Sequence, residues 1–360
     1  DKVDYFTGSS RDKVGRKMSK SLSNSPDPIE LIEKDGPEGV RMGMLLASPA
    51  GNDLPFDESY CEQGRNFSNK IWNALRLIKS QKVEDIPQSN SSKLAIEWFR
   101  AKINQTLSLL EDDFSKYRLS ESLMRVYKFI WDDFCSWYLE IIKPAYQSPM
   151  DKATYEQTLD IFETLMKILH PFMPFVTEEI YHLIREREEK DFIMLAQMPE
   201  VQPFDEKLLA DFEFVQEFVA CIRAVRNEKN IPQKNTLEAF FAKTAEAEVV
   251  EKYSELITKL CNLQTLALCD QKVEKSVAKM VRTMEVFVPF ADNINKEEEI
   301  KKINEEIKYF EGFKASVEKK LANENFVNKA PQKVVDTERK KLSDCEQKLQ
   351  TLREQLAGLA

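Results

Sequence analysis

Two lysines stand three residues apart in a polar stretch near the start of the chain, "GRKMSKSLSNSPDP" (15–28). Lys17 and Lys20 alternate with serines, and Pro26 and Pro28 limit the stretch on its far side. Ammonium groups on a short loop that opens and closes can move onto a polyanion and stabilise negative charge that grows in a transition state. A solvated basic surface loop has the same composition, so the elements around this loop must decide between the two interpretations.

Composition excludes several classes of protein. The chain has 360 residues, 42% hydrophobic and 31% charged, with a net charge of −9, which predicts a soluble protein of two or three domains. No apolar run approaches the roughly 20 residues that span a bilayer, and the first thirty residues are polar, so we expect no membrane partner, no signal peptide and a cytoplasmic location.

Metal and disulfide chemistry are also disfavoured. The six cysteines are scattered without a Cys-x-x-Cys pair, which predicts buried or incidental thiols rather than a zinc site or a disulfide framework. His170 and His182 are the only histidines, too few for most His-based triads or multi-His metal sites. We therefore expect no bound metal.

The first 55 residues contain six of the nine glycines and few strong helical repeats, which predicts loops and short elements. The run "VDYF" (3–6) predicts a strand whose partner strands lie upstream of this sequence.

From about residue 56 the apolar residues recur with the 3.6-residue period of helices that bury one face, and the pattern predicts a helix bundle. The four predicted helices cover Glu62 to Gln81, Ser92 to Tyr117, Ser120 to Tyr146 and Lys152 to Ile184. Pro171 and Pro174 end or kink the last of them, and Thr177 is predicted to cap its continuation.

The rest of the chain predicts two further parts. A helix around Glu206 to Glu228 and the β-rich runs "TLEAFFAKT", "LQTLALCD" and "MEVFVPF" indicate a small α+β subdomain. From about residue 294, apolar residues repeat at three and four positions on both sides of Pro331, which predicts an antiparallel coiled-coil hairpin. The repeating residues are Ile300, Ile303, Ile307 and Phe310 in the first helix and Leu342, Cys345, Leu349, Leu352 and Leu356 in the second. From Lys296 onward the sequence has fourteen Lys and Arg and thirteen Asp and Glu, so the hairpin is basic relative to the rest of the chain. This balance fits either an RNA-binding arm or a coiled coil whose surface is laced by salt bridges.

The loop residues Lys17, Met18, Ser19, Lys20 and Ser21 spell the signature loop of the class I aminoacyl-tRNA synthetases. The wider sequence resembles the valyl-tRNA synthetase family over its whole length. The matching stretches are "FTGSSRDKVGRKMSKSLSNSPDPIELIEKDGPEGVRMGMLLASPAGNDLPFDE", "GRNFSNKIWNALR", "HPFMPFVTEEIYHLI", "IRAVRNEKNIPQK" and the terminal heptads. Ser23 departs from the family, which usually has glycine there, and this puts the mobility of the loop in doubt.

The resemblance implies a function for each part. Lys20 would contact ATP phosphates during adenylate formation, Lys17 would assist, and Ser19 and Ser21 would hold the loop. Exposed side chains of the first bundle helix, among them Arg65, Asn69 and Arg76, would contact tRNA. Basic residues of the hairpin would touch phosphates at the outer corner of tRNA, namely Lys319, Lys320, Lys329, Lys333, Arg339, Lys340 and Lys341.

The resemblance also implies what this chain lacks. The family's His-x-Gly-His motif is absent, and so is the editing domain that hydrolyses wrongly attached threonine. The chain is therefore predicted to be a C-terminal fragment of a valine–tRNA ligase, inactive alone. The full enzyme would use ATP, Mg²⁺, valine and tRNA(Val) as substrates, with no metal or cofactor held in the fragment.

The predicted fold is mainly α, in four regions. They are the end of the catalytic core with the signature loop and stem-contact region (1–55), an anticodon-binding bundle (56–205), a small α+β subdomain (206–292) and a coiled-coil tRNA-binding arm (293–360). We expect a monomer. Two alternatives stay open: a stand-alone tRNA-binding module, which the orphan strand at the start disfavours, and a helical scaffold with a protein-binding coiled coil, which gives the signature loop no purpose.

Overall fold

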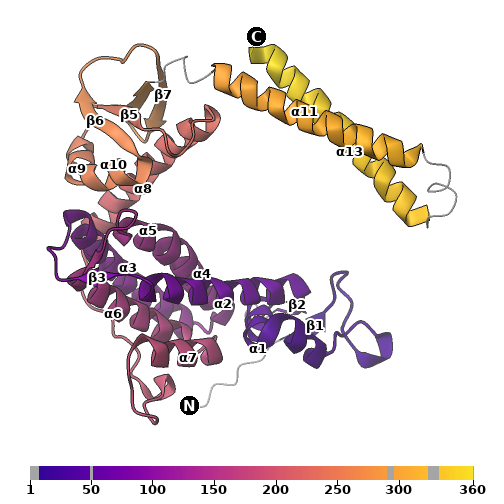
Figure 1. Ribbon diagram of the computed structural model, residues 1–360. Coiled ribbons are helices and arrows are strands. Elements are labelled where there is room, and N and C mark those ends of the chain that lie inside the picture. The colour runs from indigo at the N-terminus through magenta and orange to yellow at the C-terminus, as the bar shows by residue number, and fades with distance from the viewer. Residues whose placement is uncertain (1–7, 49–51, 290–295, 323–331, 360) are drawn as a thin grey trace. The chain divides into compact units, whose positions relative to one another are not determined.

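The computed structural model describes residues 8–48, 52–289, 296–322 and 332–359, with side chains left out at 296–303, 332–334, 347, 351, 354, 355 and 357–359. The chain divides into two compact units, Asp1–Val273 with Ala278–Val288, and Glu274–Val277 with Pro289–Ala360. The mainly helical fold is confirmed (Figure 1). The strand predicted over "VDYF" lies outside the described residues.

The first 48 residues contain a long helix, so the prediction of only loops and short elements there is wrong. Helix α1 (Pro28–Leu46) begins at Asp27, whose carboxylate accepts a hydrogen bond of 2.7 Å from the amide of Ile29. Gly36, at φ 76°, breaks the helical geometry in the middle, and Pro37 starts the second half. Strand β1 (Ser10–Arg11) precedes α1 and strand β2 (Leu54–Pro55) follows it. The two strands pair in parallel.

The predicted bundle is present, with its helices in the predicted order (Figure 1). Its helices are α2 (Glu58–Lys79), α3 (Asn90–Ser115), α4 (Leu119–Lys128), α5 (Leu139–Ile142), α6 (Lys152–Leu169) and α7 (Pro174–Ile184). A ten-residue π-helical segment, Phe129–Tyr138, joins α4 to α5, which the sequence pattern did not predict. A parallel pair, β3 (Val83–Glu84) with β4 (Met150–Asp151), links two connections of the bundle.

Aromatic side chains fill the centre of the bundle. Phe99 of α3 stacks on Phe129 at 5.1 Å between ring centroids, and Phe134 stacks on Phe162 of α6 at 5.4 Å. Tyr138 is fully buried, and its hydroxyl forms a hydrogen bond of 2.9 Å with that of Thr158. Aromatic surface of this size contributes much of the free energy that holds α3, α6 and the π-helical segment together.

The break before α7 is confirmed, but the predicted role of Thr177 is wrong. Helix α7 starts at Pro174, so Thr177 lies inside its first turn, and the hydroxyl donates to the carbonyl oxygen of Met173 at 2.7 Å. His170 Nδ1 lies 2.7 Å from the same hydroxyl. The N-cap residue is Met173, whose side chain makes no capping hydrogen bond.

The α+β subdomain is built on helix α8 (Glu206–Glu228) and a four-stranded sheet of order β6-β5-β8-β7 (Figure 1). β5 (Leu237–Ala242) pairs in parallel with β6 (Leu263–Cys269) and antiparallel with β8 (Met284–Pro289). The three predicted strands are present, while β7 (Ser276–Val281), α9 (Ala247–Lys252) and α10 (Ser254–Cys261) were not predicted. Phe212 of α8 stacks on Trp98 of α3 at 3.9 Å and so joins the subdomain to the bundle.

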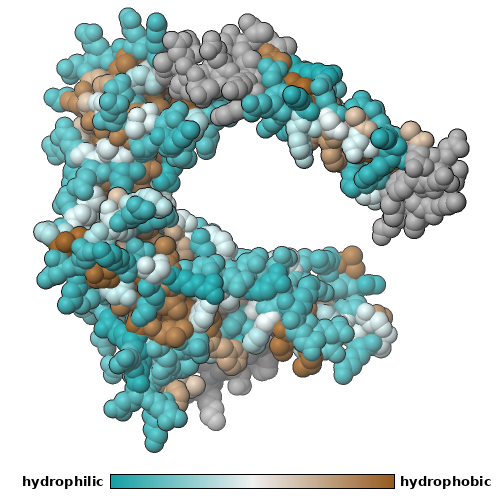
Figure 2. Space-filling model, in the orientation of Figure 1, coloured by the Kyte–Doolittle hydropathy of each residue, from teal (hydrophilic) through white to brown (hydrophobic). Residues whose placement is uncertain are grey.

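The second unit contains the predicted hairpin of α11 (Lys296–Leu321) and α13 (Gln332–Leu359), which run side by side (Figure 1). Cys345, Leu349 and Leu352 of the predicted heptads are buried, with Val317 and Val335. Ile300 and Ile303 lie outside the described side chains. Figure 2 shows a mostly hydrophilic surface on the visible face of both units.

Candidate functional site

The signature loop ends in a 3₁₀ turn, Lys20–Leu22, that the loop's own serines hold. The hydroxyl oxygen of Ser19 accepts a hydrogen bond of 3.3 Å from the amide of Leu22 and lies 3.1 Å from the hydroxyl of Ser21. The turn and its cap thus contain Ser19, Lys20 and Ser21, while Lys17 lies before them and forms an antiparallel bridge with Arg11. Their contacts with ATP remain a prediction.

Met18 anchors this loop between its two lysines. The amide of Met18 donates to the carbonyl oxygen of Ser10 in β1 at 2.8 Å, and its side chain packs against the buried cluster of Leu31, Phe56 and Cys61. Lys17 and Lys20 are exposed on either side, and neither ammonium group has an ion pair or hydrogen bond within the part of the chain that the structure describes. Both ammonium groups can therefore bind an anion without first losing a protein partner.

Asn24 closes the loop, a role that the sequence did not reveal. Its carboxamide oxygen accepts from the amide of Ser19 at 2.9 Å, while its Nδ2 donates to the carbonyl oxygen of Lys17 at 3.2 Å and to Asp12 Oδ2 at 3.0 Å. This hydrogen bond is the main reason that the pKa of Asp12 is lowered to about 2. The only sequence signal was a short amide side chain just after the signature residues.

Ser23 occupies the position where glycine is usual in the family, and its backbone is left-handed, with φ 50°. Left-handed geometry costs a residue with a Cβ about 1–2 kcal/mol. We expect Ser23→Gly to raise the free energy of unfolding of the chain by about 0.5–1 kcal/mol, part of the relief being offset by the greater freedom of glycine in the unfolded chain. Urea unfolding measures this change.

Ser25→Gly is the matched control for this substitution, because Ser25 is also exposed but has no positive φ. Its substitution should lower stability or leave it unchanged. An equal loss of stability in both variants would contradict the strain at Ser23.

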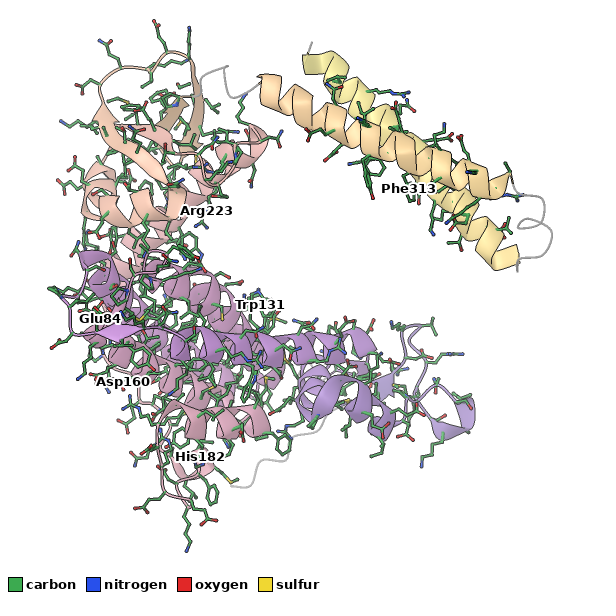
Figure 3. The ribbon with its side chains drawn as sticks, in the orientation of Figure 1. Glu84, Trp131, Asp160, His182, Arg223 and Phe313 are labelled. Atoms are coloured by element: carbon green, nitrogen blue, oxygen red, sulfur yellow. The ribbon has the colours of Figure 1, made fainter. Side chains whose placement is uncertain are left out.

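Helix α2 presents an exposed polar stripe of neutral side chains that ends in a cation. Its members are Asn66, Asn69, Asn73 and Arg76. The predicted tRNA contacts Asn69 and Arg76 lie on this stripe, and Arg76 has no side-chain partner among the residues that the structure describes. Beside the stripe, Lys70 Nζ lies 5.2 Å from the centroid of the half-buried Trp131 ring, which faces α2 (Figure 3). The cation at this ring is Lys70, and binding of tRNA by Asn69 and Arg76 remains a prediction.

Arg65, the third predicted contact on this helix, has partners within the chain. Its guanidinium lies 3.2 Å from the buried carboxylate of Asp35 and donates to the carbonyl oxygen of Lys34 at 3.3 Å. These contacts tie α2 to α1, and tRNA binding by Arg65 remains a prediction.

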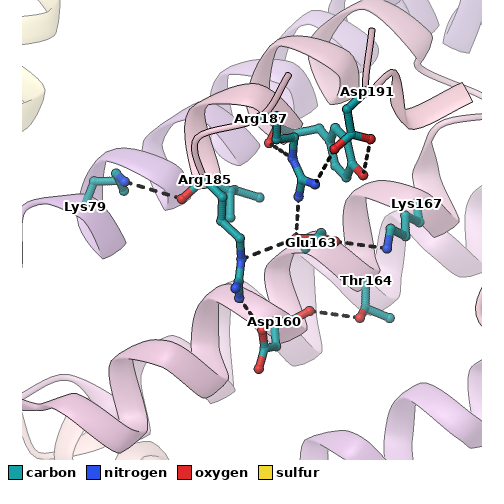
Figure 4. Close-up of polar contacts among 10 residues, drawn as sticks. Lys79, Asp160, Glu163, Thr164, Lys167, Arg185, Arg187 and Asp191 are labelled. Atoms are coloured by element: carbon teal, nitrogen blue, oxygen red, sulfur yellow. Dashed lines mark hydrogen bonds and ion pairs between the residues drawn. The ribbon is translucent and has the colours of Figure 1, made fainter. Parts of the chain in front are cut away.

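Other cations near the end of α2 are held by carboxylates (Figure 4). Glu163 lies 2.9 Å from Lys167 and 2.6 Å from Arg187, and the guanidinium of Arg187 also covers the ring of Tyr181 at 3.4 Å. Arg185 pairs with Asp160. Lys79, at the end of α2, donates only to the carbonyl oxygen of Ile184 at 3.5 Å. Arg76 and Lys79 are therefore cations of α2 that no carboxylate neutralises among the residues that the structure describes.

The predicted cations of the arm differ in their partners. Lys341 and Lys320 lie 2.7 and 3.8 Å from the buried carboxylate of Glu338, and Arg339 lies 3.9 Å from Asp336. Lys319 and Lys340 are exposed and have no ion pair within the described residues. Lys329 lies outside the described residues, and the side chain of Lys333 is not described.

The described residues contain neither a cluster of metal ligands nor a membrane-spanning helix. No His, Cys, Asp and Glu side chains come together there in a group of three that could hold a metal ion. None of the described helices is both long and apolar enough to cross a bilayer. All six cysteines are free thiols.

Three family models match the chain in succession. Residues 2–57 match the class I tRNA synthetases for Ile, Leu, Met and Val, residues 97–241 match the anticodon-binding domain of tRNA ligases, and residues 295–360 match the tRNA-binding arm of valyl-tRNA synthetases.

Curated relatives match almost the entire chain. A valine–tRNA ligase of Parabacteroides distasonis is 52% identical over 356 residues, which cover 99% of this chain and 40% of that protein. The valine–tRNA ligase of Christiangramia forsetii is 47% identical with the same coverage, and that of Fusobacterium nucleatum is 36% identical over 98% of this chain and 41% of its own length. The chain thus spans about 40% of the length of the relatives that it matches.

Proposed function

Because the chain belongs to the valine–tRNA ligase family, we propose that it is the C-terminal, tRNA-binding part of an enzyme that activates valine with ATP and transfers it to tRNA(Val). The observation that carries this proposal is the order of the matches. A catalytic region, an anticodon-binding domain and a tRNA-binding arm follow one another in a chain that is 52% identical to a named valine–tRNA ligase.

In the proposed reaction the signature loop acts on ATP, which enters as a substrate with Mg²⁺. The valine carboxylate attacks the α-phosphorus and pyrophosphate leaves, so negative charge grows on the leaving phosphates. Lys20 and Lys17 would stabilise this charge, which is an interaction that strengthens in the transition state. Ser19, Ser21 and Asn24 would keep the turn in the shape that presents the two ammonium groups.

We propose that the four regions divide this work. Residues 1–55 would complete the adenylation site, 56–205 would bind the anticodon side of tRNA, 206–292 would support the bundle, and 293–360 would contact the outer corner of tRNA. We propose that the full enzyme acts as a monomer in the cytoplasm and has no membrane partner. The part that this chain covers would hold no resident metal.

Two measurements test the function. The full-length enzyme should catalyse valine-dependent exchange of pyrophosphate into ATP and should charge tRNA(Val). The chain alone should bind tRNA(Val) and show no exchange above background, since it contains no His-x-Gly-His motif. Exchange that depends on another amino acid, or a chain that does not bind tRNA, would overturn the proposal.

The arm allows a prediction about salt dependence. Each phosphate contact that is lost should reduce the slope of log K against log salt by about one. Because Lys319 and Lys340 are unpaired within the described residues, we expect the double variant Lys319→Ala, Lys340→Ala to reduce the slope of tRNA binding by about two. Binding of tRNA to this chain, measured between 50 and 200 mM salt, gives the slope.

Lys320→Ala combined with Lys341→Ala removes the same charge from two lysines that pair with Glu338. This control should change the slope less, because part of its charge is already neutralised. An unchanged slope in the first variant would leave the arm without a phosphate-binding role at these lysines.

A further inference from the structure

Helix α7 begins without a cap of its own. Its N-cap residue, Met173, has no side-chain acceptor, and Pro174, the first helical residue, has no amide hydrogen. The first amides in need of an acceptor are therefore those of Phe175 and Val176. Backbone amides at a helix start that lack a partner destabilise the helix when they are buried.

Glu38 of α1 supplies the missing acceptor from 137 residues away in sequence. Its Oε1 accepts hydrogen bonds of 2.7 Å from the amide of Phe175 and 2.8 Å from that of Val176. A carboxylate at a helix N-terminus is stabilised by both the charged hydrogen bonds and the helix dipole. One helical turn further along α1, Arg41 Nε lies 3.4 Å from the carbonyl oxygen of Phe172.

The burial of Glu38 shows that this contact is costly to build. The side chain is 7% exposed, and burial raises the pKa of its carboxyl while the two amides lower it. Its second oxygen, Oε2, is buried with no hydrogen-bond partner among the described residues. An apolar side chain would fill this place without the cost of desolvating a charge, so packing alone does not explain a glutamate here.

A neighbouring face of α1 is fixed against α2. A Cβ added to Gly39 would lie 2.7 Å from the carbonyl oxygen of Cys61, and one added to Gly64 would lie 2.9 Å from the Cα of Gly39. The backbones of the two helices are therefore in direct contact. Helix α1, which follows the signature loop in sequence, thus contacts both α2 and the start of α7.

We propose that Glu38 is a positioning residue that fixes α1, and with it the signature loop, on the anticodon-binding bundle. This inference rests on the proposed function, since it assigns Glu38 a part in aligning bound tRNA with the reaction centre. Adenylate formation needs the loop and the catalytic core but not the bundle, whereas transfer to tRNA also needs the loop and the bundle in a fixed relation. Loss of the contact therefore affects the second step more than the first.

Amide hydrogen exchange in this chain tests the contact directly. In Glu38→Ala the amides of Phe175 and Val176 should exchange about tenfold faster or more, the order expected for the loss of a charge-assisted hydrogen bond. Glu38→Gln keeps a carbonyl acceptor and should restore part of the protection. Glu33→Ala, an exposed glutamate of the same helix, should change nothing. Unchanged exchange of both amides in Glu38→Ala would overturn the proposal.

Kinetics of the full-length enzyme test the positioning role. Glu38→Ala should lower kcat/KM for tRNA about tenfold while valine-dependent pyrophosphate exchange stays within about twofold, and Glu38→Gln should recover much of the loss. Equal losses in both reactions, with a lower Tm, would show a merely structural residue and overturn the proposal. If the unsubstituted enzyme shows no valine-dependent exchange, the proposed function fails, and the amide measurement alone then decides whether Glu38 holds α7.

Discussion

Lys20→Ala in the full-length enzyme is expected to lower the rate of valyl-adenylate formation about 100- to 1,000-fold, the usual cost of removing one group that stabilises transition-state charge. The ammonium group of Lys20 is exposed at the start of the 3₁₀ turn and has no partner within the described residues, so it is free to follow the phosphates. The affinity for valine should change little, since the proposed role of the loop is to stabilise charge on the phosphates. Valine-dependent pyrophosphate exchange at varied ATP and valine concentrations separates the two effects.

Lys13→Ala is the matched control for this prediction. Lys13 is also an exposed lysine near the loop, but it lies 3.0 Å from the carboxylate of Asp57 and is not one of the signature residues. Its substitution should leave turnover within about twofold. A Lys20→Ala enzyme with normal turnover and only a raised requirement for valine would refute the role of Lys20.

Arg226→Leu is expected to lower the free energy of unfolding of the chain by about 3 kcal/mol or more, because it removes a buried donor from three carbonyl groups, one of them on a buried residue. The side chain of Arg226 is 1% exposed. Its guanidinium donates to the carbonyl oxygens of Pro232, Asn235 and Cys261, each at 2.8 Å. These hydrogen bonds attach both the turn after α8 and the end of α10 to the guanidinium of Arg226. Urea unfolding of this chain measures the loss.

Arg223→Leu provides the comparison on the same helix. Arg223 is half-buried and donates one hydrogen bond of 3.2 Å to the carbonyl oxygen of Leu260, so its loss should cost about 1 kcal/mol. Equal losses in the two variants would mean that the buried donors of Arg226 contribute little.

The elements that the sequence predicted correctly are those whose buried face is apolar. The bundle helices, α8 and the hairpin repeat their apolar residues at three and four positions. In α6, for example, residues with this spacing are buried in the structure, among them Phe162, Leu165 and Leu169. The π-helical segment carries the same apolar residues at a slightly wider spacing, which a search for the 3.6-residue period does not separate from an ordinary helix.

Helix α1 could not be predicted in this way because its buried face is not apolar. Asp35, Glu38, Gly39 and Gly43 are buried there beside Leu31 and Met42, and Gly36 and Pro37 interrupt the middle. Glycines and carboxylates lower the helical signal, although here they are the residues that make contact with α2 and α7. The period of hydrophobicity is therefore weakest where the packing is closest.

In the candidate site, too, some residues could be identified from the sequence and others only from the structure. The two lysines could be proposed from the sequence by their types and spacing, and their role stays a prediction. Asn24 and Glu38 could not, since their roles depend on partners that only the fold brings near, Lys17 and Asp12 for the first and Phe175 for the second. The positive φ of Ser23 is likewise visible only in the structure, since the sequence showed this residue only as a departure from the family that it resembles.

The cap of α7 by Glu38 has a consequence for the order in which the protein is made. Phe175 follows Glu38 by 137 residues. At a synthesis rate of about 5–20 residues per second, Phe175 is added to the nascent chain about 7 to 27 seconds after Glu38. During that interval the carboxylate lacks the amides of Phe175 and Val176, so we expect it to stay hydrated and to keep this side of α1 open to water. We therefore expect desolvation of Glu38 to wait until α7 is made, so that the segment that bears the signature loop completes its docking as one of the late steps of cotranslational folding.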